Sequence, residues 1–248
     1  MRGERFSLGV SFLIFCFFIL MNVAIIAAAG QGTRAGGGQA KQFRELGGTP
    51  IIIHTLRRFE QSTSIREVIV VVPEGDIAGF LQLAGRYTLA KIARVVAGGR
   101  TRTETVWRGL QAVRAATAEI VAVHDGVRPF VTSEQIDLTV EAACIGGAAI
   151  LAVPATDTIK EVRGARVMRT PERATLWHAQ TPQCFRYELM RRAYERALAE
   201  NWEVTDDSAL VERLGGAVTV VEGDTRNIKI TRPEDIAIAE LLLREAKE

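Results

Sequence analysis

The sequence predicts an α/β fold of the doubly wound type, with a mainly parallel sheet covered by helices on both faces. Short apolar runs alternate with segments of helical periodicity along most of the 248 residues. The runs are rich in β-branched residues and apolar on both alternating faces, as strands covered on both sides should be. Glycine-rich or polar segments follow several runs, at the sheet edge where ligands bind in such folds.

The predicted elements follow one another in regular alternation. Predicted strands cover residues 23–28, 67–72, 92–96, 120–124, 148–153 and 217–221. Predicted helices cover residues 51–60, 75–83, 104–115, 134–144 and 186–200. A last helix begins near Thr231, which can cap it, with Pro233 in the first turn and Glu234 closing a capping box.

Composition narrows the class of protein. The length suits one α/β domain, and a hydrophobic content of 48% is enough for a large core. The formal net charge of +2 argues against a general nucleic-acid binder. Three widely spaced cysteines, Cys16, Cys144 and Cys184, form no metal or disulfide pattern. The sequence therefore predicts a cytoplasmic protein.

The N-terminal segment allows two interpretations. Residues 6–29 carry no charge and follow Arg2 and Arg5, as in a membrane anchor. The second half of this run, however, also reads as the first buried strand, and one segment cannot serve both purposes. We expect residues 1–20 to be an extension upstream of a natural start at Met21, or disordered. On this interpretation residues 21–248 form the domain, and no membrane association is expected.

Residues 156–183 interrupt the alternation. Two short polar runs, at 158–162 and 166–170, flank Gly164 and predict a β-hairpin. A hairpin that projects from an α/β domain can act as a dimerisation arm or a substrate flap. A plain surface excursion remains the alternative.

The first candidate site is the glycine-rich loop after the first strand. Gly30 and Gly32 would let backbone N–H groups approach phosphate oxygens. Arg34 and Lys41 add cations that could stabilise charge developing during nucleotidyl transfer. The loop lacks the Gly-Lys-Ser/Thr end of a Walker A motif, and its glycine spacing differs from the dinucleotide fingerprint.

Two further candidates follow later strands. Asp125 ends a predicted buried strand, where it could hold Mg²⁺ on phosphates or merely cap the next turn. We expect its neighbour His124 to be structural rather than a general base. Residues 98–105, with two glycines and several hydroxyls, suit either a nucleotide or an ordinary capped helix start.

Four polar segments remain open on composition alone. Each of them could cap a helix, pack in the core or bind a ligand. The four are Arg173, residues 176–183, residues 205–207 and residues 227–231.

Taken together, these segments resemble one known family, the 2-C-methyl-D-erythritol 4-phosphate cytidylyltransferases. The resemblance runs from about Met21 to the C-terminus. It is carried by AAAGQGTR with KQF, GGRTRTETV, VHDGVRPF, PATDTIK, LWHAQTPQ, VTDDSALVE and NIKITRPED. Their order over so long a stretch is far more specific than any one motif.

The resemblance implies a Rossmann-like nucleotidyltransferase fold and a homodimer joined by the hairpin arm. It implies CTP and a sugar-alcohol phosphate as substrates, with Mg²⁺ as cofactor and Asp125 linked to it. Arg34 and Lys41 match the catalytic cations. Arg173, Thr205 and Lys229 match residues that position the acceptor, with Arg173 reaching the partner's site. The implied CTP-binding residues are Ala28, Ala29, Gly30, Gly32, Thr33, Gly98, Thr105 and Asp125.

The sequence also departs from the family pattern. Ala40 stands where the family usually has proline, and residues 35–39 are unusually rich in glycine, which should raise the ordering cost of CTP binding. Two alternatives stay open. One is a ribitol 5-phosphate cytidylyltransferase with the same CTP site, and the other is a catalytically idle, regulatory relative.

Overall fold

The computed structural model describes residues 20–30, 40–202 and 204–245. The predictions for residues 1–19 and for Gly32, Thr33 and Arg34 concern residues outside this part of the chain. Within it, no helix combines the length and the apolar character needed to cross a membrane.

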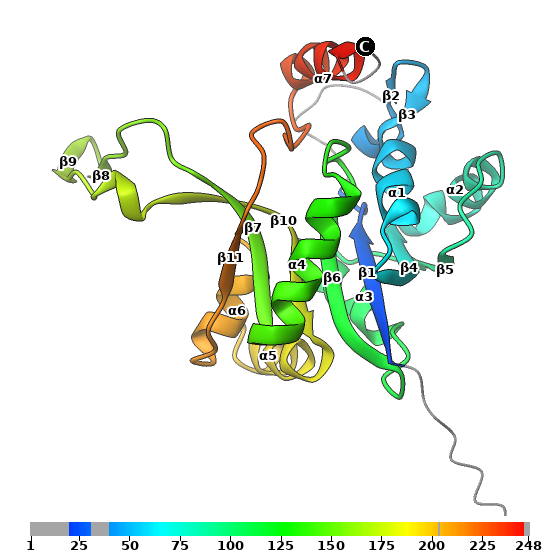
Figure 1. The fold of residues 1–248 in the computed structure, drawn as a ribbon, viewed down its shortest axis with the longest axis horizontal. Helices are drawn as coiled ribbons and strands as arrows, with labels where there is room; N and C mark the ends of the chain where they lie inside the picture. Colours follow the sequence, from blue (N-terminus) through cyan, green and yellow to red (C-terminus); the bar gives the residue numbers. More distant parts are fainter. Residues whose placement is uncertain (1–19, 31–39, 203, 246–248) are drawn as a thin grey trace, which may run out of the picture.

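A seven-stranded sheet forms the centre of the molecule (Figure 1). The strand order is β11-β7-β10-β6-β1-β4-β5, and only β10 runs antiparallel to its neighbours. The strands are β1 (Met21–Ala27), β4 (Ile65–Val72), β5 (Ile92–Ala97), β6 (Ala118–Asp125), β7 (Ala148–Pro154), β10 (Trp177–Arg186) and β11 (Thr219–Glu222). The predicted doubly wound, mainly parallel α/β sheet is confirmed.

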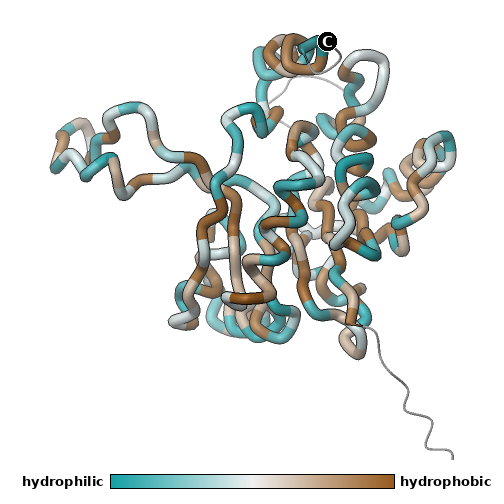
Figure 2. The backbone as a smooth tube through the Cα atoms, in the orientation of Figure 1, coloured by the Kyte–Doolittle hydropathy of each residue, from teal (hydrophilic) through white to brown (hydrophobic). Residues whose placement is uncertain are grey.

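Helices cover both faces of the sheet because alternate residues of a strand contribute to two different hydrophobic cores. In β1, Ala24 and Ile26 join one core, while Val23 and Ile25 join the other. Hydrophobic stretches of the backbone follow these central strands (Figure 2). The first core is covered by α1 (Ile51–Gln61), α2 (Ile77–Ala84) and α4 (Ser133–Gly146). The second is covered by α3 (Arg102–Gln111), α5 (Tyr187–Ala199) and α6 (Ser208–Arg213).

A small third core closes the upper edge of the molecule. There α7 (Pro233–Glu245) packs near the short strand β2 (Glu45–Leu46), which pairs with β3 (Thr49–Pro50). The buried residues of this core are Leu46 of β2, Ile51 at the start of α1, Ile230 ahead of α7 and Ala239 of α7. A 3-10 turn, η2 (Lys41–Phe43), leads into this region.

The sequence did not predict the strand β10, the helix α6 or the two-residue strands β2 and β3. On composition, residues 176–183 are a polar segment with no predicted secondary structure. In the structure they belong largely to β10, a central strand in which Gln180, Thr181 and Gln183 are buried. Their polar groups are satisfied by tertiary hydrogen bonds, which a local pattern does not reveal. The helix α6 is only six residues long, which gives a weak periodic signal.

Some helix ends also differ from expectation. The helix α3 ends at Gln111 rather than near residue 115, and α2 starts at Ile77 after a separate 3-10 turn, Glu74–Asp76. At α7 the carboxylate that closes the cap is Asp235, not Glu234. Asp235 accepts hydrogen bonds from the backbone N–H groups of Thr231 and Arg232, because α7 begins at Pro233 and Asp235 is its third residue.

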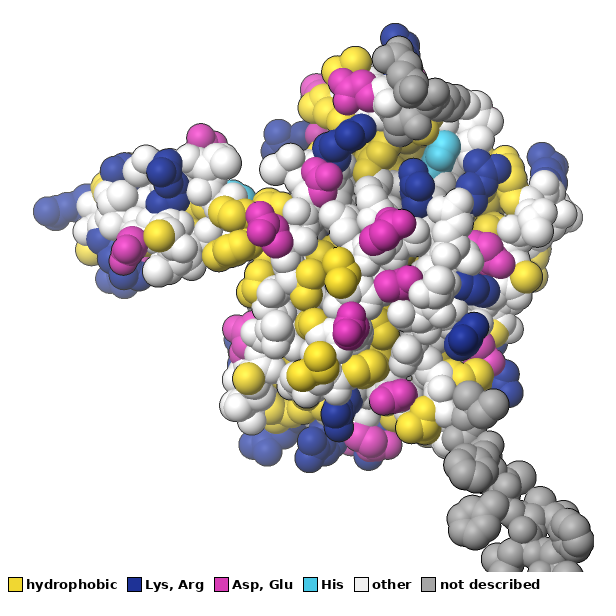
Figure 3. Space-filling model, viewed as in Figure 1, with side chains coloured by type: hydrophobic (Ala, Val, Ile, Leu, Met, Phe, Trp, Pro, Cys, Tyr) yellow, Lys and Arg dark blue, Asp and Glu magenta, His cyan; other side chains and the backbone are white. Residues whose placement is uncertain are grey.

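An arm projects from the body at the end of β7 (Figure 1). It contains the antiparallel pair β8 (Glu161–Arg163) and β9 (Arg166–Arg169), with Gly164 in the turn at φ +59°. The arm is exposed along these strands and basic side chains gather at its tip (Figure 3). Its role in dimerisation stays a prediction.

Candidate active site

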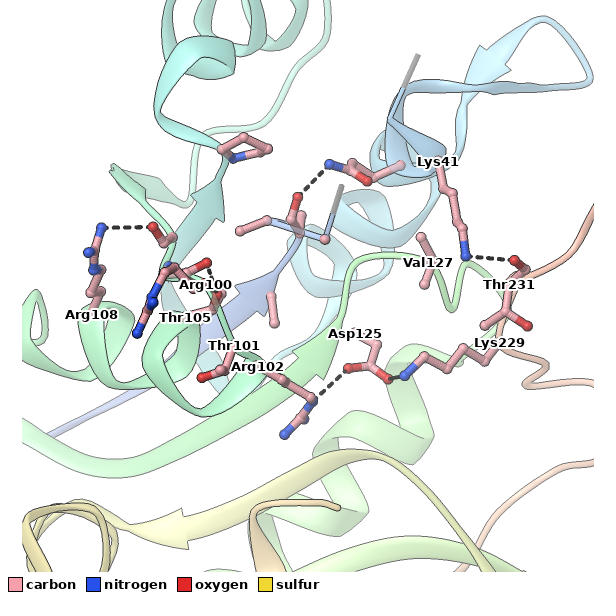
Figure 4. A pocket seen from close by; sticks show the side chains of 18 of the residues that line it. Lys41, Arg100, Thr101, Arg102, Thr105, Arg108, Asp125, Val127, Lys229 and Thr231 are labelled. Carbon is pink, nitrogen blue, oxygen red and sulfur yellow. Dashed lines mark hydrogen bonds and ion pairs between the residues drawn. The ribbon is translucent and has the colours of Figure 1, made fainter. Parts of the chain in front are cut away.

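A cavity of about 870 Å³ opens at the carboxyl ends of β1, β5 and β6 (Figure 4). This is the edge at which open α/β sheets bind ligands. Its described lining combines backbone of glycine-rich turns with many cations. The charged side chains are Lys41, Arg100, Arg102, Arg108 and Lys229, opposed by Glu74 and Asp125.

The end of the first strand forms one wall. Ala28, Ala29 and Gly30, for which CTP binding is predicted, line the cavity, while Gly32, Thr33 and Arg34 lie outside the described residues. The buried Gln42 side chain donates through Nε2 to the carbonyl of Ala28 at 2.6 Å, which ties η2 to this wall.

Lys41 stands on η2 and lines the cavity, with its side chain directed toward Thr231 (Figure 4). Its Nζ donates to the carbonyl of Thr231 at 2.6 Å. The contact joins η2 to the segment before α7, although the two are far apart in sequence.

Residues 98–105 form the opposite wall. An added Cβ at Gly98 would lie 2.1 Å from Ala29 Cβ, so only glycine allows these strand ends to approach so closely. The Thr105 hydroxyl accepts from Gly99 N–H at 3.2 Å. Thr101 caps α3 by accepting from Glu104 N–H. The segment is therefore a capped helix start and also cavity lining.

Asp125, at the end of β6, is surrounded by cations. Its Oδ2 lies 2.7 Å from Lys229 Nζ, and its Oδ1 lies 3.3 Å from Arg102 Nε. Arg128 Nε is 3.8 Å away. Burial alone would raise the pKa of this carboxyl, but Arg102 and Lys229 outweigh that effect and hold the pKa well below its usual range. Asp125 is therefore ionised at neutral pH.

The sequence did not single out the pair formed by Arg102 and Asp207. Arg102 NH1 and NH2 donate to the two carboxylate oxygens of Asp207 at 2.9 and 2.7 Å. Tyr194 of α5 donates its hydroxyl to the same carboxylate. The only available signal was charge, an arginine after the glycines and an aspartate before α6.

His124 is structural, as expected. Its Nε2 faces the carbonyl of Arg128 at 3.1 Å, and its Nδ1 faces the Thr181 hydroxyl at 3.1 Å. Because a carbonyl only accepts, the proton belongs on Nε2, and Thr181 donates to Nδ1. Burial lowers the pKa of His124 to about 4, so the ring is neutral at pH 7.

The buried amides of β10 hold the loop that carries Lys229. Asn227 Nδ2 donates to Gln180 Oε1 at 3.1 Å and to the Thr181 carbonyl at 3.0 Å. Gln183 Oε1 accepts from the N–H groups of Asp207 and Ser208 at 3.0 Å each. Gln180, Thr181 and Gln183 thus hold the segments that carry Lys229 and Asp207.

Two predicted residues lie outside the described lining of the cavity. Arg173 stands in the arm, exposed, and its NH1 donates to the Thr156 carbonyl at 3.0 Å. Thr205 is exposed beside Asp206, ahead of α6. The chain by itself does not bring either residue to Asp125.

The donor set indicates which cation the cavity suits. Among the described residues, no cluster of three or more His, Cys, Asp or Glu side chains could hold a metal ion. Mg²⁺ in nucleotide sites is commonly held by one or two carboxylates together with substrate phosphates. Asp125 therefore fits a Mg²⁺ ion that arrives with a nucleotide rather than one caged by protein alone.

Comparisons with known proteins identify the family. The family model for 2-C-methyl-D-erythritol 4-phosphate cytidylyltransferase matches residues 22–245. The chain belongs to this family. The cytidylyltransferase of Halalkalibacterium halodurans is 47% identical over 221 residues, which cover 89% of this chain and 96% of that protein.

Solved structures of the family share the fold. The 4-diphosphocytidyl-2C-methyl-D-erythritol synthase of Anaerococcus prevotii matches with a TM-score of 0.82 and 34% identity, over 91% of this chain and 96% of that one. The 2-C-methyl-D-erythritol 4-phosphate cytidylyltransferase of Thermus thermophilus matches with a TM-score of 0.72 and 33% identity, over 91% and 100%.

Proposed function

We propose that this protein transfers CMP from CTP to 2-C-methyl-D-erythritol 4-phosphate, releasing pyrophosphate, in isoprenoid precursor biosynthesis. The observation that carries the proposal is the match of the family model to residues 22–245. The cavity supports it, because cations and glycine backbone suit a nucleoside triphosphate. The presence of Lys41, Asp125, Arg173 and Lys229 argues against an idle regulatory relative.

The reaction is an in-line displacement. An oxygen of the acceptor phosphate forms a bond to the α-phosphorus of CTP, and the bond from that phosphorus to the bridging oxygen of pyrophosphate breaks. The attacking oxygen is already ionised, so no general base is needed. This agrees with a buried, neutral His124. Catalysis then depends on positioning and on charge stabilisation.

The charged residues of the cavity are proposed to have different roles in this charge stabilisation. Lys41, with Arg34, is proposed to neutralise charge on the α-phosphate and departing pyrophosphate. Mg²⁺, held by Asp125 and the CTP phosphates, would supply further charge neutralisation when bound. Lys229, whose Nζ lies 2.7 Å from Oδ2 of Asp125, is proposed to bind the anionic acceptor beside that carboxylate.

The active form is proposed to be a cytoplasmic homodimer. Arg173, on the arm, is not among the described residues that line the cavity of its own chain. In a symmetric pair, each arm could carry Arg173 to the other protomer's cavity and position the acceptor, with Thr205 as a further contact. Exposed Val162, Val167 and Met168 on the arm offer apolar surface for such a contact.

The deciding experiment measures pyrophosphate release from CTP and Mg²⁺ by the full chain. Methylerythritol phosphate and ribitol 5-phosphate are offered in parallel, and Lys41→Met is the inactive control. Turnover with methylerythritol phosphate alone is expected. Turnover with ribitol 5-phosphate alone would mean that the acceptor is ribitol 5-phosphate, while the proposed CTP site would stand. No pyrophosphate release with either acceptor would overturn the proposal.

A further inference from the structure

Arg102 bridges two buried carboxylates that come from distant parts of the chain. Its NH1 and NH2 bind Asp207, ahead of α6, and its Nε faces Asp125 at 3.3 Å. The side chain of Asp207 is 2% exposed and that of Asp125 is 9% exposed. Neither anion can rely on water for its stability, so the guanidinium compensates both of them, together with Lys229 at Asp125 and the Tyr194 hydroxyl at Asp207.

The bridge also links the parts of the fold that surround the cavity. Arg102 is the first residue of α3 and directly follows the lining segment 98–101. Asp207 is itself held by the Tyr194 hydroxyl, and the Tyr194 ring stacks on Trp107 of α3. An anchored Asp207 therefore fixes the plane of the guanidinium, and that plane fixes where Nε meets Asp125.

We propose, on the basis of the function proposed above, that Arg102 is a positioning residue which Asp207 holds so that Asp125 keeps its orientation toward the nucleotide. The role requires arginine. A guanidinium binds one carboxylate with two parallel N–H groups and still has Nε for the other. A lysine at this position would keep the charge but could not hold both carboxylates in a fixed geometry.

The test separates positioning from simple charge compensation. Arg102→Lys keeps a cation between the two carboxylates, so its melting temperature is expected to stay close to that of the unmodified protein. Its kcat/KM for CTP is expected to fall about tenfold, the size of effect seen when a group that orients a ligand is lost. Asp207→Asn, which releases the guanidinium from the other side, is expected to give a similar kinetic loss.

A second readout does not depend on the acceptor. The affinity for CTP with Mg²⁺, measured by titration calorimetry, is expected to fall in Arg102→Lys by a similar factor. Failure of the proposed acceptor would abolish turnover in every protein but leave this difference intact. The matched control is Arg114→Lys, because Arg114 pairs with Glu67 in an exposed ion pair outside the cavity.

Two results would overturn the proposal. One is Arg102→Lys with unchanged kcat/KM and CTP affinity. The other is a kinetic loss that appears only in proportion to lost thermal stability across Arg102→Lys, Arg102→Met and Asp207→Asn, since that would mark a purely structural ion pair.

Discussion

The ammonium group of Lys229 lies 2.7 Å from Oδ2 of Asp125, inside the cavity (Figure 4). The lysine comes from the loop before α7 and the carboxylate from the end of β6. The Lys229 side chain is 40% exposed and that of Asp125 is 9% exposed, so the lysine brings an opposite charge from the open side of the cavity to a buried carboxylate.

Replacing Asp125 by asparagine is expected to lower kcat/KM for CTP at least about 100-fold, because an amide cannot balance the surrounding cations or hold Mg²⁺. Pyrophosphate release measures the loss. Glu119→Gln is the control, since Glu119 is exposed at the opposite end of the same strand. Near-normal kinetics in Asp125→Asn would remove this carboxylate from the mechanism.

Gly98→Ala is expected to raise the KM for CTP, because the new Cβ would lie 2.1 Å from Ala29 Cβ and push the two cavity walls apart. Overpacking of this kind costs about 1–3 kcal/mol. Gly75→Ala is the matched control, as nothing lies within 4 Å of its added Cβ. Calorimetric CTP titration compares the variants, and equal affinities would show that the walls tolerate the methyl group.

His124 makes stability depend on pH. The folded-state pKa of His124, lowered by burial to about 4, lies below the ordinary value of 6.5, so the unfolded chain binds more protons between these pH values. The contribution of the neutral ring is complete above pH 6.5 and is lost as pH falls toward 4. The predicted loss between pH 7 and pH 5 is about 2 kcal/mol.

Urea denaturation at both pH values tests this dependence. His124→Gln is expected to be less stable at pH 7 and to show a smaller loss toward pH 5. His178→Gln, at an exposed site on β10, is expected to follow the unmodified protein. Parallel curves for all three proteins would mean that His124 does not govern the pH response.

Ala40→Pro is expected to lower the KM for CTP. Ala40 has φ −59°, close to the value that proline imposes, and its carbonyl still accepts from Phe43 N–H. Proline at a compatible position reduces the freedom of the chain ahead of Lys41, for a gain of about 0.4–1 kcal/mol. Steady-state kinetics with varied CTP provide the measurement, and an unchanged or higher KM counts against the idea.

Mixing Arg173→Ala with Lys41→Ala tests the exchange of arms. If Arg173 serves the partner's cavity, a mixed dimer has one intact site, and random pairing restores about a quarter of full activity. Each variant alone is expected to be nearly inactive. No recovery after subunit exchange would place Arg173 at its own chain's site, and a monomer in solution would remove the arm's role.

The sequence by itself determined the sheet class and most strands. Buried parallel strands leave a strong local trace, because both faces must be apolar. The candidates Gly30, Lys41, Gly98, Thr105, Asp125 and Lys229 could also be found from their places after strands and in motifs, and all of them line the cavity.

Only the tertiary structure decided what the polar segments do. The sequence of β10 is polar at Gln180, Thr181 and Gln183. These side chains can be buried because they form hydrogen bonds with residues far away in the sequence, and a local sequence pattern does not reveal such partners. The ion pair between Arg102 and Asp207 likewise forms only when α3 and α6 pack on the same face of the sheet. The local sequence pattern of apolar residues shows which segments are buried. The pairing of buried charges depends instead on which elements come into contact in the folded protein.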